Sequence, residues 1–496
     1  MFRYIVAPLV VSLLLPSAVA ARELPEIAHR LPSGEEWLVH AMRDLVPYWS
    51  SPEALGEPIG QFPTYRYADG TPIEGDELLR PEYSWIAEHA PWLGLRLDRT
   101  YTRMISRQAY VLAMAFHMTG DGRYLAWAKA AVDHILDDLA DGEGSFCSWV
   151  VRGSCAPAPP RRTAQDLSYA LLGPAAYAYV TRDPDTLRAV AEAHRAFFDA
   201  YRDAETGLVR WVLEASEDPP DTFSPEQVEL VAQLDPINAY LLVLEPLVPA
   251  PDAEAWRADL VSLAKLLRKR FYSAEHNVFW GRIDAAEYRR LAGHHHTDTG
   301  HTAKSFWMLG LVARRTGDGS TERWAREGGR RLLDAVFLEE SGSWAGGWGE
   351  DGVVAGEASW WAHAELDQLA ATLALADPSA ARHLPRTYEH WLTRFVDHHH
   401  GGTWASPVEP TEQPAGLKAF LWKNGYHSME HALVAYIAAN ALRGEGVSLY
   451  FAPAEGTEPA VWRPYCFEGH PEIVRRLPLP QLEGHDRLEI RFSEIR

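Results

Sequence analysis

Histidines that precede an apolar run are the residues of this sequence best suited to chemistry. Residues 293–308 read GHHHTDTGHTAKSFWM, so His294–His296 and His301 come before a stretch with helical spacing. An imidazole, with an unperturbed pKa near ~6.5, can bind a metal, exchange protons or simply lie in a loop. With Asp298 nearby, the triplet could bind a metal adventitiously, but its position between predicted helices favours a solvated loop. A second triplet, His398–His400, has the same setting.

His427 begins another helical run, and its surroundings contain a second candidate motif. HSMEH (427–431) matches the pattern H-x-x-E-H, in which two histidines one helical turn apart bind zinc in a class of peptidases. Such a site needs a third ligand, and the motif lies on the last helix of a helical series. We therefore predict no metal site.

The helices that would position these histidines recur along the chain at intervals of about 60–70 residues. Each unit has an apolar helix, an Asp-containing turn, an amphipathic helix and a Gly/Trp-rich segment with the length of a short β-hairpin. The apolar helices are predicted at 107–118, 168–180, 238–248, 301–315, 360–375 and 427–442, and the amphipathic ones at 124–139, 187–201, 255–272, 322–337, 381–396 and 34–49. Six helices that are apolar nearly all round predict an all-α fold, an (α/α)6 barrel with short β-hairpin loops. An open solenoid of helix pairs is the alternative.

Both ends of the chain differ from the repeats. Residues 1–20 carry Arg3, an apolar run and Ala18 and Ala20 around Val19, which predicts a signal peptide cut after Ala20 and a periplasmic or secreted protein. No later apolar run has spanning length, so we expect no stable membrane insertion. After Gly444 the pattern becomes β-rich, which predicts a barrel over 21–444 and an extension over 445–496 packed on it.

Composition limits the partners. A net charge of −21 argues against nucleic acid and anionic membranes, because both are bound by clustered Lys and Arg. Nineteen tryptophans fit a saccharide, whose C–H faces stack on indole rings. In an oxidising compartment Cys147 and Cys155 could form a local disulfide, leaving Cys466 buried. We expect a monomer or a homodimer.

Polar side chains in the first turns of the apolar helices would converge on one mouth of such a barrel. They are Arg103, Arg107, Tyr169, Asp235, Asn238, His301, Lys304, Trp360, Glu365, His427 and Glu430. Two histidines, carboxylates, arginines and an indole in one mouth suit a neutral polar substrate such as a sugar.

Several of these positions resemble motifs of the N-acylglucosamine 2-epimerase and cellobiose 2-epimerase family, which includes aldose–ketose isomerases acting on mannose. The matches are Gly300–His301 with Trp307 six residues later, WWAHAE (360–365), WKNGYH (422–427) and, through Arg107, SRQAYVL (106–112). The resemblance runs from about Arg103 to Leu442.

This resemblance implies cofactor-independent proton transfer beside a sugar's carbonyl, giving 2-epimerisation or aldose–ketose isomerisation through an enediolate. It makes His301 and His427 the acid/base pair and Arg107 a contact to the sugar oxygens. It further implies sugar stacking by Trp360 and Trp422. Glu365 matches the acid of the Trp-Trp motif, and Trp307 matches another aromatic wall.

Three positions depart from the family pattern. Lys304 stands where the family carries Glu, and Glu430 stands where it carries Arg, which suggests one ion pair across the mouth with reversed polarity. Tyr169 replaces a histidine suited to opening a cyclic sugar, and with Asn238 it completes the expected substrate-binding set. Two alternatives stay open: a glycoside hydrolase or polysaccharide lyase using Glu365, Glu430 and Asp235, and a non-catalytic saccharide-binding protein.

Overall fold

The computed structural model describes residues 25–73, 84, 91–218, 221–250, 252–293, 295–409, 416–455 and 461–496. The predicted signal peptide (1–20) and His294 lie outside these described residues.

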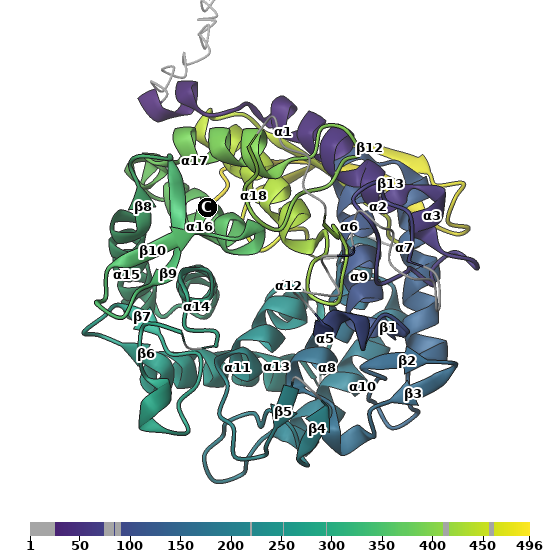
Figure 1. Cartoon of the computed structure of the whole chain (residues 1–496). Helices are drawn as coiled ribbons and strands as arrows, with labels where there is room; N and C mark the ends of the chain where they lie inside the picture. Colours follow the sequence, from purple (N-terminus) through teal and green to yellow (C-terminus); the bar gives the residue numbers. More distant parts are fainter. Residues whose placement is uncertain are drawn as a thin grey trace, which may run out of the picture.

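Helix pairs follow one another around a ring (Figure 1). The inner segments are α6 (Thr102–Thr119), α8 (Ala164–Ala170) with α9 (Leu172–Thr181), α11 (Leu230–Pro236) with α12 (Leu242–Leu244), α14 (Thr299–Thr316), α16 (Trp360–Ala374) and α18 (Tyr426–Leu442). The outer segments are α7 (Gly122–Asp133), α10 (Pro184–Tyr201), α13 (Asp252–Leu266), α15 (Gly319–Val336), α17 (Leu384–His390), and α1 (Gly34–His40) with α2 (Val46–Ser50) and α3 (Pro52–Leu55). The predicted (α/α)6 barrel is confirmed.

Burial separates the two sets of helices as their sequences predict. Almost every residue of α16 and α18 is buried, because both helices are surrounded by other helices. In α15 only one face is buried, at positions such as Ala325, Leu332 and Val336, and its charged residues face solvent.

The Asp-containing turns of the repeat begin the outer helices. The Asp121 carboxylate accepts the Arg123 N–H of α7, that of Asp183 accepts the Thr186 N–H of α10, and that of Asp318 accepts the Thr321 N–H of α15. Each carboxylate satisfies one of the N–H groups that a helix start leaves without a partner.

Short strands connect the helix pairs at several places. They are β1 (Arg99–Tyr101), β2 (Trp149–Val151) and β3 (Ser154–Ala156); β4 (Ser216–Asp218) and β5 (Asp221–Phe223); β6 (Tyr272–Ser273) and β7 (Val278–Phe279); and β8 (Phe337–Leu338), β9 (Ser343–Trp348) and β10 (Val354–Glu357). All of these pairings are antiparallel. A disulfide joins Cys147 to Cys155 at the β2–β3 hairpin, and Cys466 is a buried free thiol.

The C-terminal segment forms the β-rich tail that the sequence predicts. Strands β11 (Val447–Phe451), β13 (Asp486–Ser493) and β12 (His470–Pro478) pair in that order. Tyr450 accepts a hydrogen bond through its carbonyl from His117, near the C-terminal end of α6. The tail therefore lies at the end of the ring opposite to the first turns of the inner helices.

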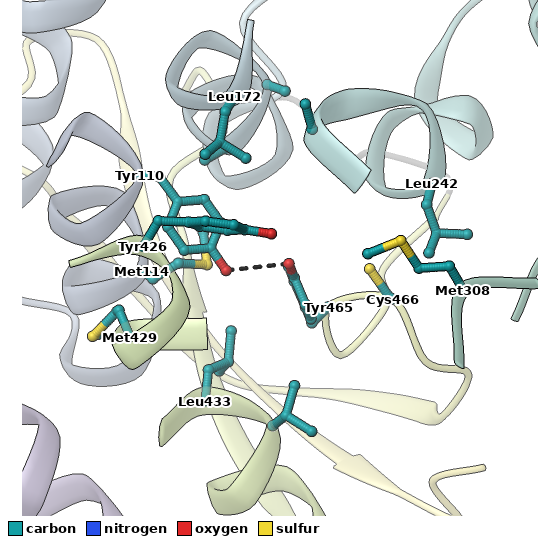
Figure 2. Packing of buried hydrophobic residues seen from close by; sticks show 14 of the residues in the cluster. Tyr110, Met114, Leu172, Leu242, Met308, Tyr426, Met429, Leu433, Tyr465 and Cys466 are labelled. Atoms are coloured by element: carbon teal, nitrogen blue, oxygen red, sulfur yellow. Dashed lines mark hydrogen bonds between the residues drawn. The ribbon is translucent and has the colours of Figure 1, made fainter. Parts of the chain in front are cut away.

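One loop of this tail enters the ring. Figure 2 shows Tyr465 and Cys466 among side chains of several inner helices, with Tyr110 of α6 and Tyr426 of α18 close by. The Tyr110 hydroxyl donates a hydrogen bond to that of Tyr465, at 3.1 Å. The tail thus fills part of the interior of the ring.

Among the described residues, no helix combines the length and the apolar character needed to cross a bilayer.

Candidate active site in the first turns of the inner helices

His301 lies in the first turn of α14, where the residue that begins the helix also orients its ring. Asp298, the N-cap residue, accepts the His301 backbone N–H at 2.7 Å through Oδ1. Its Oδ2 lies 2.6 Å from Nδ1 of His301. Burial alone would raise the pKa of Asp298, but His301 and these hydrogen bonds hold it below its usual value. An ionised Asp298 favours the proton on Nδ1 of His301, which leaves Nε2 able to accept one.

His427 occupies the equivalent turn of α18 and also faces a carboxyl group. Its Nδ1 lies 3.0 Å from Oε1 of Glu365, whose Oε2 accepts the Trp307 indole N–H at 2.8 Å. Burial raises the pKa of Glu365 to about 7. Burial and the cations of Lys304 and Arg107 hold the pKa of His427 well below its usual value, so its imidazole is neutral. Glu365 and His427 therefore form a buried pair that can share one proton.

Trp361 joins the two histidines. Its ring centroid lies 4.6 Å from that of His301 and 5.9 Å from that of His427. A Cβ on Gly300 would lie 2.6 Å from this indole, so the glycine before His301 makes the close packing possible. Nε2 of each histidine has no hydrogen-bond partner within the described parts of the chain. Both histidines can thus exchange a proton beside one aromatic surface.

The Lys304 ammonium is buried in the ring and has two hydrogen-bond partners among the described residues. Its Nζ donates to Oδ1 of Asp235 at 2.8 Å and to the Tyr169 hydroxyl at 3.0 Å. Burial lowers the pKa of Lys304, but Asp235, Tyr169 and Glu365 outweigh it and hold this pKa above its usual value. The predicted Lys304–Glu430 ion pair is therefore wrong. Asp235 is the counter-ion because α11 is the neighbour of α14 in the ring.

Arg107 is a buried cation with unused hydrogen-bonding capacity. Its guanidinium lies over the Tyr169 ring, 3.8 Å from the centroid, and only 4% of the residue is exposed. Its Nε and Nη1 have no hydrogen-bond partner in the part of the chain that the structure describes. Unpaired donors on a buried cation suit the oxygen atoms of a substrate.

A chain of hydrogen bonds continues from Tyr169 across the ring. Asn238 donates to the Tyr169 hydroxyl at 3.2 Å and accepts from the Tyr426 hydroxyl at 2.8 Å. Asn238 therefore links α8 with α18 within the predicted substrate-binding set.

Glu430 lies beside Glu365 and His427 and contacts the C-terminal tail. Its Oε1 accepts a hydrogen bond from the Tyr465 hydroxyl of the C-terminal tail, and its Oε2 is buried with no partner among the described residues. Burial, and next the neighbouring Glu365, raise the pKa of Glu430. Glu430 therefore links this polar site to the C-terminal tail and does not pair with Lys304.

The tryptophans of the site differ in their contacts and in their exposure. Trp360 is 7% exposed, with its ring facing the Lys423 ammonium, so Trp361 rather than Trp360 contacts both histidines. Trp307 is buried and serves as the donor to Glu365. Trp422 is 40% exposed and stacks on the Arg103 guanidinium at 3.8 Å.

Sequence reasoning missed Trp361, the role of Asp298 and Tyr465. The doubled Trp360–Trp361 was visible, but only the rotation of α16 decides which indole faces the site. Asp298 three residues before His301 is a standard capping spacing and could have indicated the hydrogen bond. Tyr465 is distant in sequence and gave no signal.

Two groups of side chains among the described residues could hold a metal ion: Glu365, His427 and Glu430, and Glu229, His295 and His296. In the first group the carboxyl groups already pair with His427, Trp307 and Tyr465. Among the described residues, the two histidines of the H-x-x-E-H pattern do not share a ligand group, because His431 contacts Asp367 at 3.0 Å while His427 lies with Glu365 and Glu430.

The architecture and this set of side chains define an (α/α)6-barrel protein with a buried polar site. No family model and no curated protein matches the sequence. Among solved structures, a cellobiose 2-epimerase from Spirochaeta thermophila is similar with a TM-score of 0.65 and 18% identity, over 82% of this chain and 96% of that one. A D-mannose isomerase gives 0.64 and 15%, over 84% and 100%. An unsaturated glucuronyl hydrolase from a Bacillus species gives 0.54 and 12%, over 80% and 96%.

These similarities show the fold. Sugar epimerases and isomerases are among the structural neighbours, as the sequence motifs predict, and glycoside-cleaving enzymes share the same architecture.

Proposed function

We propose that this protein is a sugar 2-epimerase or aldose–ketose isomerase that needs no cofactor. The observation that carries the proposal is the pair His301 and His427, which flank one indole. In each histidine Nδ1 lies beside a carboxyl group, and Nε2 has no partner among the described residues. Removal and return of a proton at the carbon beside a carbonyl needs one base and one acid on the substrate.

The two histidines differ in a way that suits the two roles. His301, paired with the ionised Asp298, keeps Nε2 as a base. His427 faces Glu365, which burial leaves protonated more readily, so the shared proton can lie on Glu365 and leave Nε2–H of His427 as an acid. His301 then abstracts the proton and His427 returns one to the enediolate. In the reverse reaction the roles exchange.

Arg107 is placed to stabilise the negative charge of the enediolate. Charge builds up on the oxygens of the enediolate, and the Nε and Nη1 donors of Arg107 are fixed, buried and unpaired among the described residues. A preorganised cation stabilises such charge without reorganising at the moment of reaction. Exposed Trp422 supports the sugar at the outer edge of the mouth.

Cleavage of a glycosidic bond is a less favourable assignment for these residues. A glycosidase needs two carboxyl groups that flank the bond. Glu365 and Glu430 are 0% exposed and adjacent, and Asp235 is held by Lys304. Each carboxyl group that a glycosidase would use therefore already has a partner within the protein: His427 and Trp307 for Glu365, Tyr465 for Glu430 and Lys304 for Asp235.

Deuterium incorporation tests the proposal. Mono- and disaccharides are incubated with the protein in heavy water, and exchange at C2 is followed by NMR. We expect exchange with the wild type, loss of at least about 100-fold in His301→Ala and in His427→Ala, and full activity in His470→Ala, an exposed histidine of β12. Cleavage products without exchange would identify a hydrolase or lyase, and binding with neither would identify a saccharide-binding protein.

A further inference from the structure

A second cluster of ligand-type side chains lies beside His301, outside the network described above. One ring nitrogen each of His295 and His296 and a carboxylate oxygen of Glu229 all lie within 4.8 Å of one another. Nδ1 of His296 is 3.3 Å from Oε2 of Glu229. Bonds of about 2.1 Å at a tetrahedral zinc ion place two ligand atoms about 3.4 Å apart. The Glu229–His296 pair therefore already has the spacing of two ligands of one ion.

The loop is built to bring its two imidazoles together. Neighbouring side chains in an extended segment point to opposite sides, yet the ring centroids of His295 and His296 are 3.8 Å apart. His296 has a φ of +60°, which non-glycine residues rarely adopt. A Cβ on Gly281 would lie 2.0 Å from the His295 carbonyl oxygen, so a glycine is required beneath the loop. The Gly281 N–H also donates to the hydroxyl of Thr297 at 2.8 Å.

Glu229 is fixed on the opposite side of the cluster. It is the N-cap residue of α11 and is 4% exposed. Its Oε1 lies 4.0 Å from Nε of Arg282, which leaves Oε2 directed at His296. The carboxylate is therefore held in place as a ligand before any ion binds.

We propose that Glu229, His295 and His296 bind a divalent transition-metal ion such as Zn²⁺ at the rim of the barrel. Two imidazoles and one carboxylate match the ligand preference of Zn²⁺ and of Co²⁺, and leave at least one coordination position open. The His296 ring is 4.9 Å from that of His301, so the ion lies next to the proposed acid–base site. His296 is thus more than part of a solvated loop, since it is half-buried and anchored to Glu229.

Metal binding is measured on the full-length protein after removal of metals with a chelator. Titration with Co²⁺ is followed by its visible absorption, and Zn²⁺ affinity is obtained from competition with a chromogenic chelator. We expect one equivalent of either ion in the wild type. Glu229→Gln and His295→Ala, the latter at an exposed position, should each weaken binding about 100-fold. Circular dichroism checks that both variants are folded.

The second histidine triplet provides a matched control. The His399 and His400 rings also lie close together, at 4.2 Å, but this tract belongs to neither ligand cluster of the described residues. Replacing His398–His400 with alanine should leave the affinity unchanged. Equal loss in this control, no loss in the Glu229 and His295 variants, or binding only at millimolar concentration, meaning an adventitious ion only, would each overturn the proposal.

Discussion

Lys304 shows that the effect of a buried charge on stability depends on its partner. Its ammonium is 2% exposed and is compensated by Asp235, which is 1% exposed. Removing one member of such a pair leaves the other charge buried without compensation, which is far more costly than replacing both.

We therefore expect Lys304→Met to lower the free energy of unfolding by about 3–5 kcal/mol. The double variant Lys304→Met/Asp235→Asn should be less destabilised than Lys304→Met alone, and Lys304→Met/Glu430→Gln should not be. Urea denaturation measures all three. If Lys304→Met/Glu430→Gln were the more stable double variant instead, the result would support the Lys304–Glu430 ion pair that the sequence suggested.

Trp361 is the residue whose importance depends most on the orientation of its helix. We expect Trp361→Phe to reduce kcat/KM for C2 exchange roughly fivefold to tenfold, because the smaller ring loses part of its contact with both histidines. Trp360→Phe, one residue earlier and buried, should leave kcat/KM within about twofold. Steady-state kinetics on the two variants distinguish the positions, and a larger loss in Trp360→Phe would favour the original sequence prediction.

Glu430 should make stability depend on pH in an unusual direction. Burial and Glu365 raise its pKa to about 8, above that of an unfolded chain. The folded protein therefore keeps this proton to higher pH, and the stability it provides is lost as the pH rises from about 5 through about 8.

Compared with Glu430→Gln, the wild type should lose on the order of 3 kcal/mol of unfolding free energy across that interval. Urea denaturation at several pH values, with the exposed Glu254→Gln as control, measures the difference. Parallel profiles for wild type and Glu430→Gln would show that Glu430 ionises normally.

At the scale of elements, Tyr465 connects the C-terminal tail to the site. Within the ring, the Tyr465 hydroxyl donates to Glu430. It accepts a hydrogen bond from the Tyr110 hydroxyl, as Figure 2 shows. A tail residue is thus part of the hydrogen-bonded group beside Glu365 and His427.

We expect Tyr465→Phe to destabilise the protein by about 1–3 kcal/mol, since Glu430 and Tyr110 both lose a buried partner. Tyr110→Phe, which keeps the Tyr465–Glu430 hydrogen bond, should cost less. Thermal denaturation compares the two. Equal effects would mean that Glu430 does not depend on the tail.

At the scale of the whole molecule, the barrel and the tail share one hydrophobic core. Val447, Leu449 and Ile490 of the tail belong to the same buried cluster as the ring helices. Elements that share a core unfold together, whereas a separate domain opens on its own.

Native-state hydrogen exchange should therefore give peptides of β11 and β13 the same opening free energy as those of α6 and α18, to within about 1 kcal/mol. Mass spectrometry of peptic fragments provides the measurement. If β11 and β13 instead exchanged together at a lower opening free energy than α6 and α18, residues 445–496 would be a part that unfolds independently.

The periodicity of apolar residues was enough to predict the helices, their pairing and the ring. Asp121 and Asp318 were visible as turn residues, and their capping role follows from local chemistry alone. The first turns that carry His301 and His427 were predicted for the same reason, because a helix start is encoded within a few neighbouring residues.

Contacts between segments that are distant in sequence were decided by the tertiary structure. The partner of Lys304 depends on which helix stands next to α14, and the indole beside His301 depends on the rotation of α16. The contact of Glu430 with Tyr465 depends on a tail that enters the ring. Side-chain periodicity determines which face of a helix is buried, but only the packed ring determines what that face meets.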